Sequence, residues 1–96
     1  MQTFDVAHIN EQGQDIIFVL LARKVAQYTP DEKERIRLAL TECARSAGLA
    51  GTIVLVCNDH NGDCQFWAEQ RLRAFLQSIT YELIVRNVNK RLRCSF

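Results

Sequence analysis

The chain has 96 residues, of which 48% are apolar and 24% charged. This length allows one domain, residues 1–96, with a single hydrophobic core and no room for a large catalytic cleft. Four glycines and one proline are too few for a disordered or linker-rich chain. The formal net charge of +1 on its own points neither to nucleic acid nor to another charged partner.

Two features of the sequence predict the cellular location. The longest unbroken apolar run, residues 16–22, is far shorter than the roughly 20 residues that span a bilayer. The N-terminal segment MQTFDVAHINEQ lacks the basic and apolar regions of a signal peptide. We therefore expect a cytoplasmic protein without a membrane association. Because the cytoplasm keeps thiols reduced, free thiols are expected at all four cysteines, namely Cys43, Cys57, Cys64 and Cys94.

The first predicted elements are two strands, residues 4–9 and 15–21, which form a hairpin. Gly13 lies in the short connection NEQGQ, where it supplies the backbone conformation that a tight turn needs.

A helix is predicted over residues 30–47. Thr29 caps it, Pro30 takes its first position, and Glu32 completes a capping box. Apolar residues recur at spacings of three and four, and Gly48 suits the left-handed position that ends a helix. The helix should therefore pack on a sheet through one apolar stripe.

A second hairpin is predicted from residues 52–57 and 64–68, with a turn at Asn61-Gly62, a sequence that favours type I′ turns. A short helix follows over residues 69–77. Ser78 or Thr80 then caps a last amphipathic helix, which runs from Tyr81 onward and presents one apolar face made of Ile84, Val85, Val88 and Leu92.

These elements predict an α+β fold of order ββαββαα, in which a mixed four-stranded sheet is built from two β-hairpins joined by a long helix, with a C-terminal helix pair. The alternative is a ββαβαβ fold, a two- or three-layer α/β arrangement, with one helix over residues 64–77, capped by Asp63, and a last strand over residues 80–86. In the preferred arrangement strands 15–21 and 52–57 lie parallel at the centre of the sheet. Strands 4–9 and 64–68 form its edges.

Both central strands are apolar at every position, which is typical of strands covered on both faces. Either the C-terminal helix crosses to the second face, or a second subunit covers it. We expect a homodimer, because so short a chain offers few elements to bury this area.

The second hairpin also holds reactive side chains. Cys57, His60 and Cys64 are metal-ligand types, but their spacing, Cys-x2-His-x3-Cys, matches no paired zinc motif. A thiolate at either cysteine with His60 as base would define a thiol enzyme. The simpler interpretation makes both cysteines small apolar strand residues. We therefore expect no metal, no cofactor and no catalysis, and a two-residue turn would place Cys57 opposite Phe66, which disfavours a Cys57–Cys64 disulfide.

Two further sets of residues are candidates for contacts with partners. Phe66 and Trp67 adjoin on one strand, so they point to opposite faces, and Trp67 is the residue type most often found at binding hot spots. A predicted C-terminal helix would carry four cations that could contact phosphates of nucleic acid, namely Arg86, Lys90, Arg91 and Arg93.

The sequence therefore predicts a small cytoplasmic protein-interaction or self-association module that acts as a homodimer. The alternatives are nucleic-acid binding through the basic C-terminal helix and a thiol or metal site at the Cys57–Cys64 hairpin.

Overall fold

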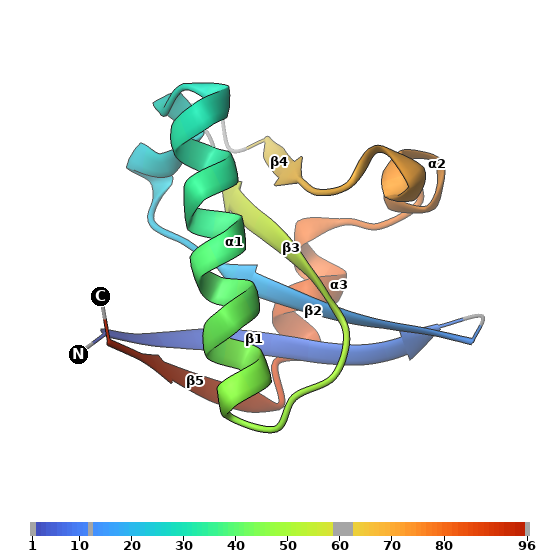
Figure 1. Cartoon of the computed structure of the whole chain (residues 1–96). Helices are drawn as coiled ribbons and strands as arrows, with labels where there is room; N and C mark the ends of the chain where they lie inside the picture. The colour runs from blue at the N-terminus through green and yellow to red at the C-terminus, as the bar shows by residue number, and fades with distance from the viewer. Residues whose placement is uncertain (1, 12, 59–62, 96) are drawn as a thin grey trace.

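The computed structural model describes residues 2–11, 13–58 and 63–95. Five strands form one mixed sheet of order β4-β3-β2-β1-β5, and helices lie on both of its faces (Figure 1). The strands are β1 Gln2–Glu11, β2 Gln14–Leu20, β3 Thr52–Asn58, β4 Cys64–Trp67 and β5 Lys90–Cys94.

The centre of the sheet is as the sequence predicts. β1 and β2 form an antiparallel hairpin, and Gly13 takes a φ of 78° in its connection, a value that glycine adopts without steric cost. β2 and β3 are parallel neighbours, joined by the crossover helix. β3 and β4 then pair antiparallel, so the second predicted hairpin is also present. The predicted Asn61-Gly62 turn lies outside the described residues.

The long helix α1, Pro30–Ser46, confirms the predicted start and end. Thr29 Oγ1 accepts a hydrogen bond from the Glu32 backbone at 3.2 Å, and the Glu32 carboxylate accepts one from the Thr29 backbone at 3.3 Å. This reciprocal pair satisfies two donors that the first helical turn leaves open. Leu40 and Ala44 on its inner face are buried.

The predicted edge of the sheet at residues 4–9 is wrong, because a fifth strand pairs with β1. The predicted last helix ends at Arg86, and residues 90–94 are β5. In this segment Leu92 and Cys94 are buried while Lys90, Arg91 and Arg93 are exposed. The segment RLRC alternates between polar and apolar residues, the period of a half-buried strand. Its pairing with β1 favours this strand over the helical spacing of Val85, Val88 and Leu92.

The C-terminal helices are short. They are the 3-10 turn η2 Gln70–Leu72, α2 Arg73–Leu76 and α3 Tyr81–Arg86, and a further 3-10 turn, η1 Arg23–Gln27, precedes α1. The alternative fold was wrong at two elements, because Cys64–Trp67 is a strand and residues 81–86 are helical. Thr80 caps α3 as predicted, accepting from the Leu83 backbone at 3.2 Å. None of the helices in the described ranges is long and apolar enough to cross a membrane.

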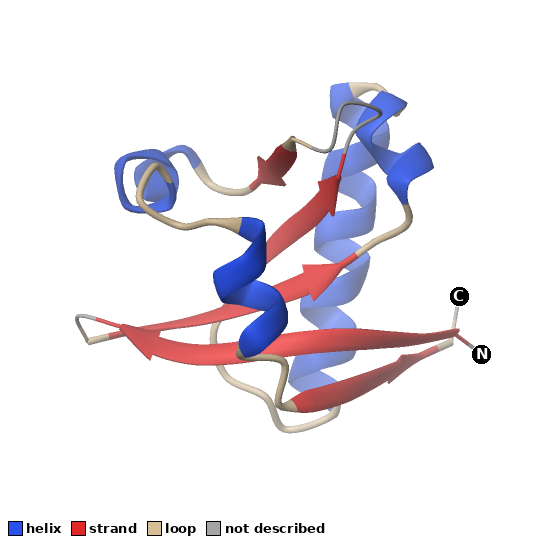
Figure 2. Cartoon of the chain, turned by 180° about the vertical axis from the view of Figure 1, so that it is seen from behind, coloured by secondary structure: helices blue, strands red, loops and turns tan. Residues whose placement is uncertain are grey.

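Both faces of β2 and β3 are buried by the chain itself, as the views from the two sides show (Figures 1 and 2). α1 covers one face, where Leu40 and Ala44 pack with residues such as Ile17 and Leu55. Ile84 of α3, with Leu72 and Leu76, covers the other face, which includes Phe18. The uncovered face that led us to expect a homodimer is therefore not present, and the oligomeric state stays a prediction.

A disulfide joins Cys43 of α1 to Cys94 of β5. The expectation of four free thiols is therefore wrong for these two residues, which are 51 positions apart in the sequence. That expectation came from the predicted location and did not consider which cysteines the fold brings together. β5 pairs with β1, and this places Cys94 beside Cys43 of α1. Cys57 and Cys64 form no disulfide among the described residues. The cytoplasmic location, which led us to expect free thiols, stays a prediction.

Candidate functional site

The two edges of the sheet differ in charge. β5 exposes Lys90, Arg91 and Arg93, and cations on an edge strand oppose pairing with further strands. β4, with the sequence CQFW, has no charged residue. Its four residues offer few backbone groups for hydrogen bonds with an added strand. A strand that pairs with β4 would therefore also need side-chain contacts.

The backbone of Phe66 points away from the sheet. The Val56 carbonyl accepts a hydrogen bond from the Leu21 N–H at 2.8 Å, so the polar groups of Val56 face β2. Val56 lies opposite Phe66 in the β3–β4 register, and residues opposite each other in an antiparallel pair either exchange both hydrogen bonds or neither. The N–H and carbonyl of Phe66 are thus directed at the open edge. Within the described part of the chain they make no backbone hydrogen bond outside the sheet.

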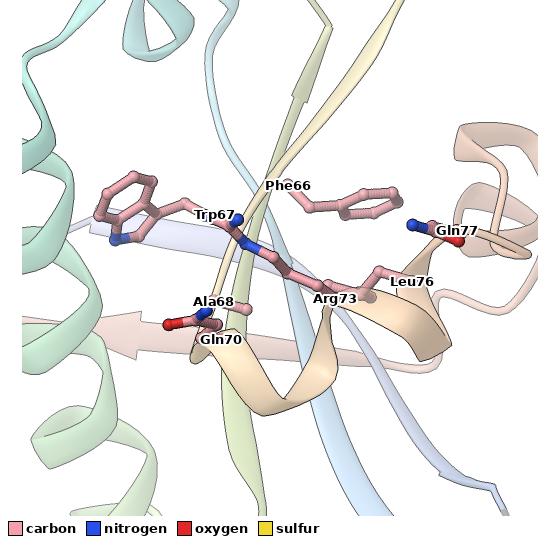
Figure 3. Close-up of a pocket in the computed structure, with 7 residues that line it drawn as sticks. All are labelled: Phe66, Trp67, Ala68, Gln70, Arg73, Leu76 and Gln77. Carbon is pink, nitrogen blue, oxygen red and sulfur yellow. The ribbon is translucent and has the colours of Figure 1, made fainter.

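A hollow of about 320 Å³ adjoins this edge. Figure 3 shows Phe66 and Trp67 extending in opposite directions from β4, while the Arg73 side chain extends from α2 across the strand. All three residues line the hollow. Leu76 forms an apolar part of the wall and is 6% exposed. The remaining lining residues are Ala68, Gln70 and Gln77.

Phe66 and Trp67 lie on opposite faces, which confirms this prediction. Trp67 packs against the core under α1, and Lys33 Nζ of α1 lies 5.7 Å from the centre of its ring. Phe66 packs against the second core, with its ring centre 6.4 Å from that of Phe18. The Trp67 indole N–H is buried without an acceptor among the described residues. Both aromatic side chains are half-buried, so each combines a core contact with an accessible surface.

The structure does not support a reactive thiol at the β3–β4 hairpin. Cys57 lies opposite Gln65 and Cys64 opposite Asn58, one position from the predicted register, and the two cysteines are not bonded to each other. Burial, with a smaller contribution from Cys57, raises the pKa of Cys64 to about 11, so its thiol stays protonated at neutral pH. His60 lies outside the described residues, and within them no three metal-ligand side chains cluster. The metal candidates therefore stay a prediction.

The four C-terminal cations do not line one helix, because three of them lie on β5. Arg86 on α3 is paired with Glu82 at 2.6 Å, and Arg91 is 3.7 Å from Asp5. Successive strand residues point to opposite faces, so Lys90 and Arg91 cannot contact the same phosphate surface. The arrangement on which the nucleic-acid interpretation depended is absent from the described residues.

Arg73 is the site residue that the sequence analysis missed. Its position in a predicted short helix gave no reason to prefer it over Arg71, two residues earlier. Only the path of the chain from β4 into η2 and α2 returns Arg73 to the strand. Comparison of the chain with protein-family models, with curated proteins and with solved structures found no match.

Proposed function

We propose that the protein is a non-catalytic protein-interaction module that binds an extended segment of a partner protein at β4. The segment adds to the sheet as a further strand, a mode in which backbone hydrogen bonds give affinity and side-chain pockets give specificity. The observation that carries this proposal is the combination, at one edge, of an outward-facing backbone at Phe66 and an adjoining hollow. A hollow lined by Arg93 and Ser95 also adjoins the β5 edge, but the cations of that strand oppose pairing with a further strand.

A second copy of this chain is the competing occupant. Antiparallel pairing of two β4 strands requires a twofold axis perpendicular to the sheet, so the hollows of both copies would lie on the same side. The two Arg73 side chains would then approach each other, and like charges that meet at an interface are unfavourable. The charge of the hollow therefore favours a segment of another protein.

Two variants of Phe66 test the strand addition. Phe66→Ala and Phe66→Pro both remove the ring, but only proline also removes the outward N–H, which lies outside the β3–β4 ladder. A phage-displayed library of random linear peptides is selected on each variant and on the wild-type protein. We expect enrichment to be about tenfold lower on Phe66→Pro than on Phe66→Ala, because one hydrogen bond is lost.

The fold of both variants is checked by circular dichroism and thermal unfolding. Equal enrichment on two folded variants would contradict pairing at Phe66. If Phe66→Pro does not fold, the same question is answered on the wild-type protein by the exchange rate of the Phe66 amide proton with an enriched peptide bound.

A further inference from the structure

Arg73 differs from its neighbour Arg71 in how its charge is satisfied. Arg71 donates to the Glu69 carboxylate at 2.6 Å, to Gln14 at 3.2 Å and to Thr52 at 3.0 Å. Arg73 is exposed and has no carboxylate within ion-pair distance in the described part of the chain. One arginine thus fastens η2 to the sheet, while the other carries an unpaired guanidinium into the hollow.

Arg73 is the one charged residue among the described residues that line the hollow. Lys33 lies over the Trp67 ring from the α1 side and is not among the lining residues. The nearest acid in sequence, Glu69, is already paired with Arg71 and lies 4.0 Å from Arg37. No acidic side chain lines the hollow among the described residues. The site therefore attracts a negative group.

A guanidinium beside aromatic rings is suited to binding a carboxylate. Its planar donors match the two oxygens of Asp or Glu, and neighbouring apolar surface reduces the solvent screening of the ion pair. In the view of Figure 3 the Arg73 side chain crosses β4 between Phe66 and Trp67, and it lines the same hollow as Phe66, the residue whose backbone faces the open edge. A strand paired there would bring its side chains within reach of this guanidinium.

From this geometry we infer that the segment bound at β4 is acidic, with an Asp or Glu side chain paired to Arg73. This inference rests on the proposed function and names the chemistry of its partner. Backbone pairing holds the segment, and the ion pair selects which segments are held.

The inference is tested with three short synthetic peptides of alternating valine and threonine, amidated at the C-terminus. They carry glutamate, glutamine or lysine at the same central position. We expect the wild-type protein to bind the glutamate peptide about tenfold more tightly than the glutamine peptide, as fluorescence anisotropy would measure, because a charge-assisted pair is lost. The lysine peptide should bind more weakly than both.

Variants of Arg73 and Arg71 separate the two arginines. Arg73→Gln should bind the glutamate and glutamine peptides equally, and Arg73→Glu should prefer the lysine peptide. Arg71→Gln, in a chain that still folds, should keep the wild-type preference. An Arg71→Gln variant that loses the preference while Arg73→Gln retains it would overturn the assignment to Arg73.

The outcomes distinguish this inference from the proposed function. Equal binding of all three peptides to the wild-type protein would overturn the acidic preference and leave strand addition standing. Binding of none of them would contradict strand addition itself. A free-acid form of the glutamine peptide that binds as tightly as the amidated glutamate peptide would show that Arg73 pairs with a chain end, which would also overturn the inference.

Discussion

At the residue scale, Cys64 should be unreactive at mildly alkaline pH. Its pKa is raised from 9.0 to about 11, so at pH 8 the thiolate fraction in the folded protein is roughly a hundredfold lower than that of an ordinary cysteine. Alkylation by iodoacetamide, followed by peptide mass spectrometry, should be slow when folded and fast in denaturant. A fast reaction of Cys64 in the folded protein would contradict this expectation.

The same shift gives a pH dependence of stability. Because the folded state holds the Cys64 proton more tightly than the unfolded state, this contribution to stability is complete below pH 9 and is lost as the pH rises toward about 11. Urea denaturation of the wild-type protein across this range should show a fall that is smaller in Cys64→Ser. An identical fall in the two proteins would remove Cys64 as a cause.

Trp67 provides a second prediction at this scale. Trp67→Phe deletes an indole N–H that has no acceptor among the described residues, so it should change the free energy of unfolding by less than about 1 kcal/mol. Trp67→Ala also removes the ring that packs on the α1 core and should cost about 2–3 kcal/mol, less than a fully buried ring. Chemical denaturation of both variants measures the difference. Equal losses would mean that the N–H is bound to a partner.

At the scale of elements, the disulfide fastens β5 to α1 across a long loop. Cross-linking residues 51 positions apart reduces the entropy of the unfolded chain, and its removal should lower the free energy of unfolding by about 2–4 kcal/mol. Urea denaturation with and without dithiothreitol measures this for the wild-type protein. The double variant Cys43→Ser, Cys94→Ser is the control, which should be less stable and insensitive to the reductant. An oxidised wild-type protein no more stable than this variant would contradict the prediction.

The elements also show where sequence reasoning succeeded. α1 was predicted within one residue because local signals mark both its ends: Thr29, Pro30 and Glu32 at the start and Gly48, with a φ of 79°, after the end. β5 was missed because its hydrogen bonds go to β1, whose paired residues lie 84 to 92 positions earlier in the chain. Its local pattern fits a helix and a strand, and only this distant partner decides between them.

The site was predictable only in part, for the same reason. Phe66 and Trp67 could be placed on opposite faces from strand periodicity alone, and β4 could be placed at an edge. The direction of the Phe66 backbone depends on the β3–β4 register. The observed register differs by one position from the register that a two-residue turn predicts. Arg73 depends on how η2 and α2 fold back, which no local pattern specifies.

At the scale of the whole molecule, both faces of the central strands are covered by the chain's own helices. This removes the hydrophobic reason for a second subunit. Sedimentation equilibrium at micromolar concentration should therefore find a monomer. A lysine on an edge strand opposes pairing with another strand. A stable dimer that is disrupted by Gln65→Lys would therefore identify β4 as the dimer interface. Gln65→Ala is the matched control.

The most direct test of strand addition is the exchange of the Phe66 amide proton with solvent, followed residue by residue by NMR. This proton faces the open edge, so it should exchange rapidly in the free protein, while the amide of Gln65, in the ladder with β3, is protected. With the glutamate peptide bound, the Phe66 amide should become protected by at least about tenfold. A saturated complex in which it still exchanges at the free rate would contradict binding by strand addition at β4.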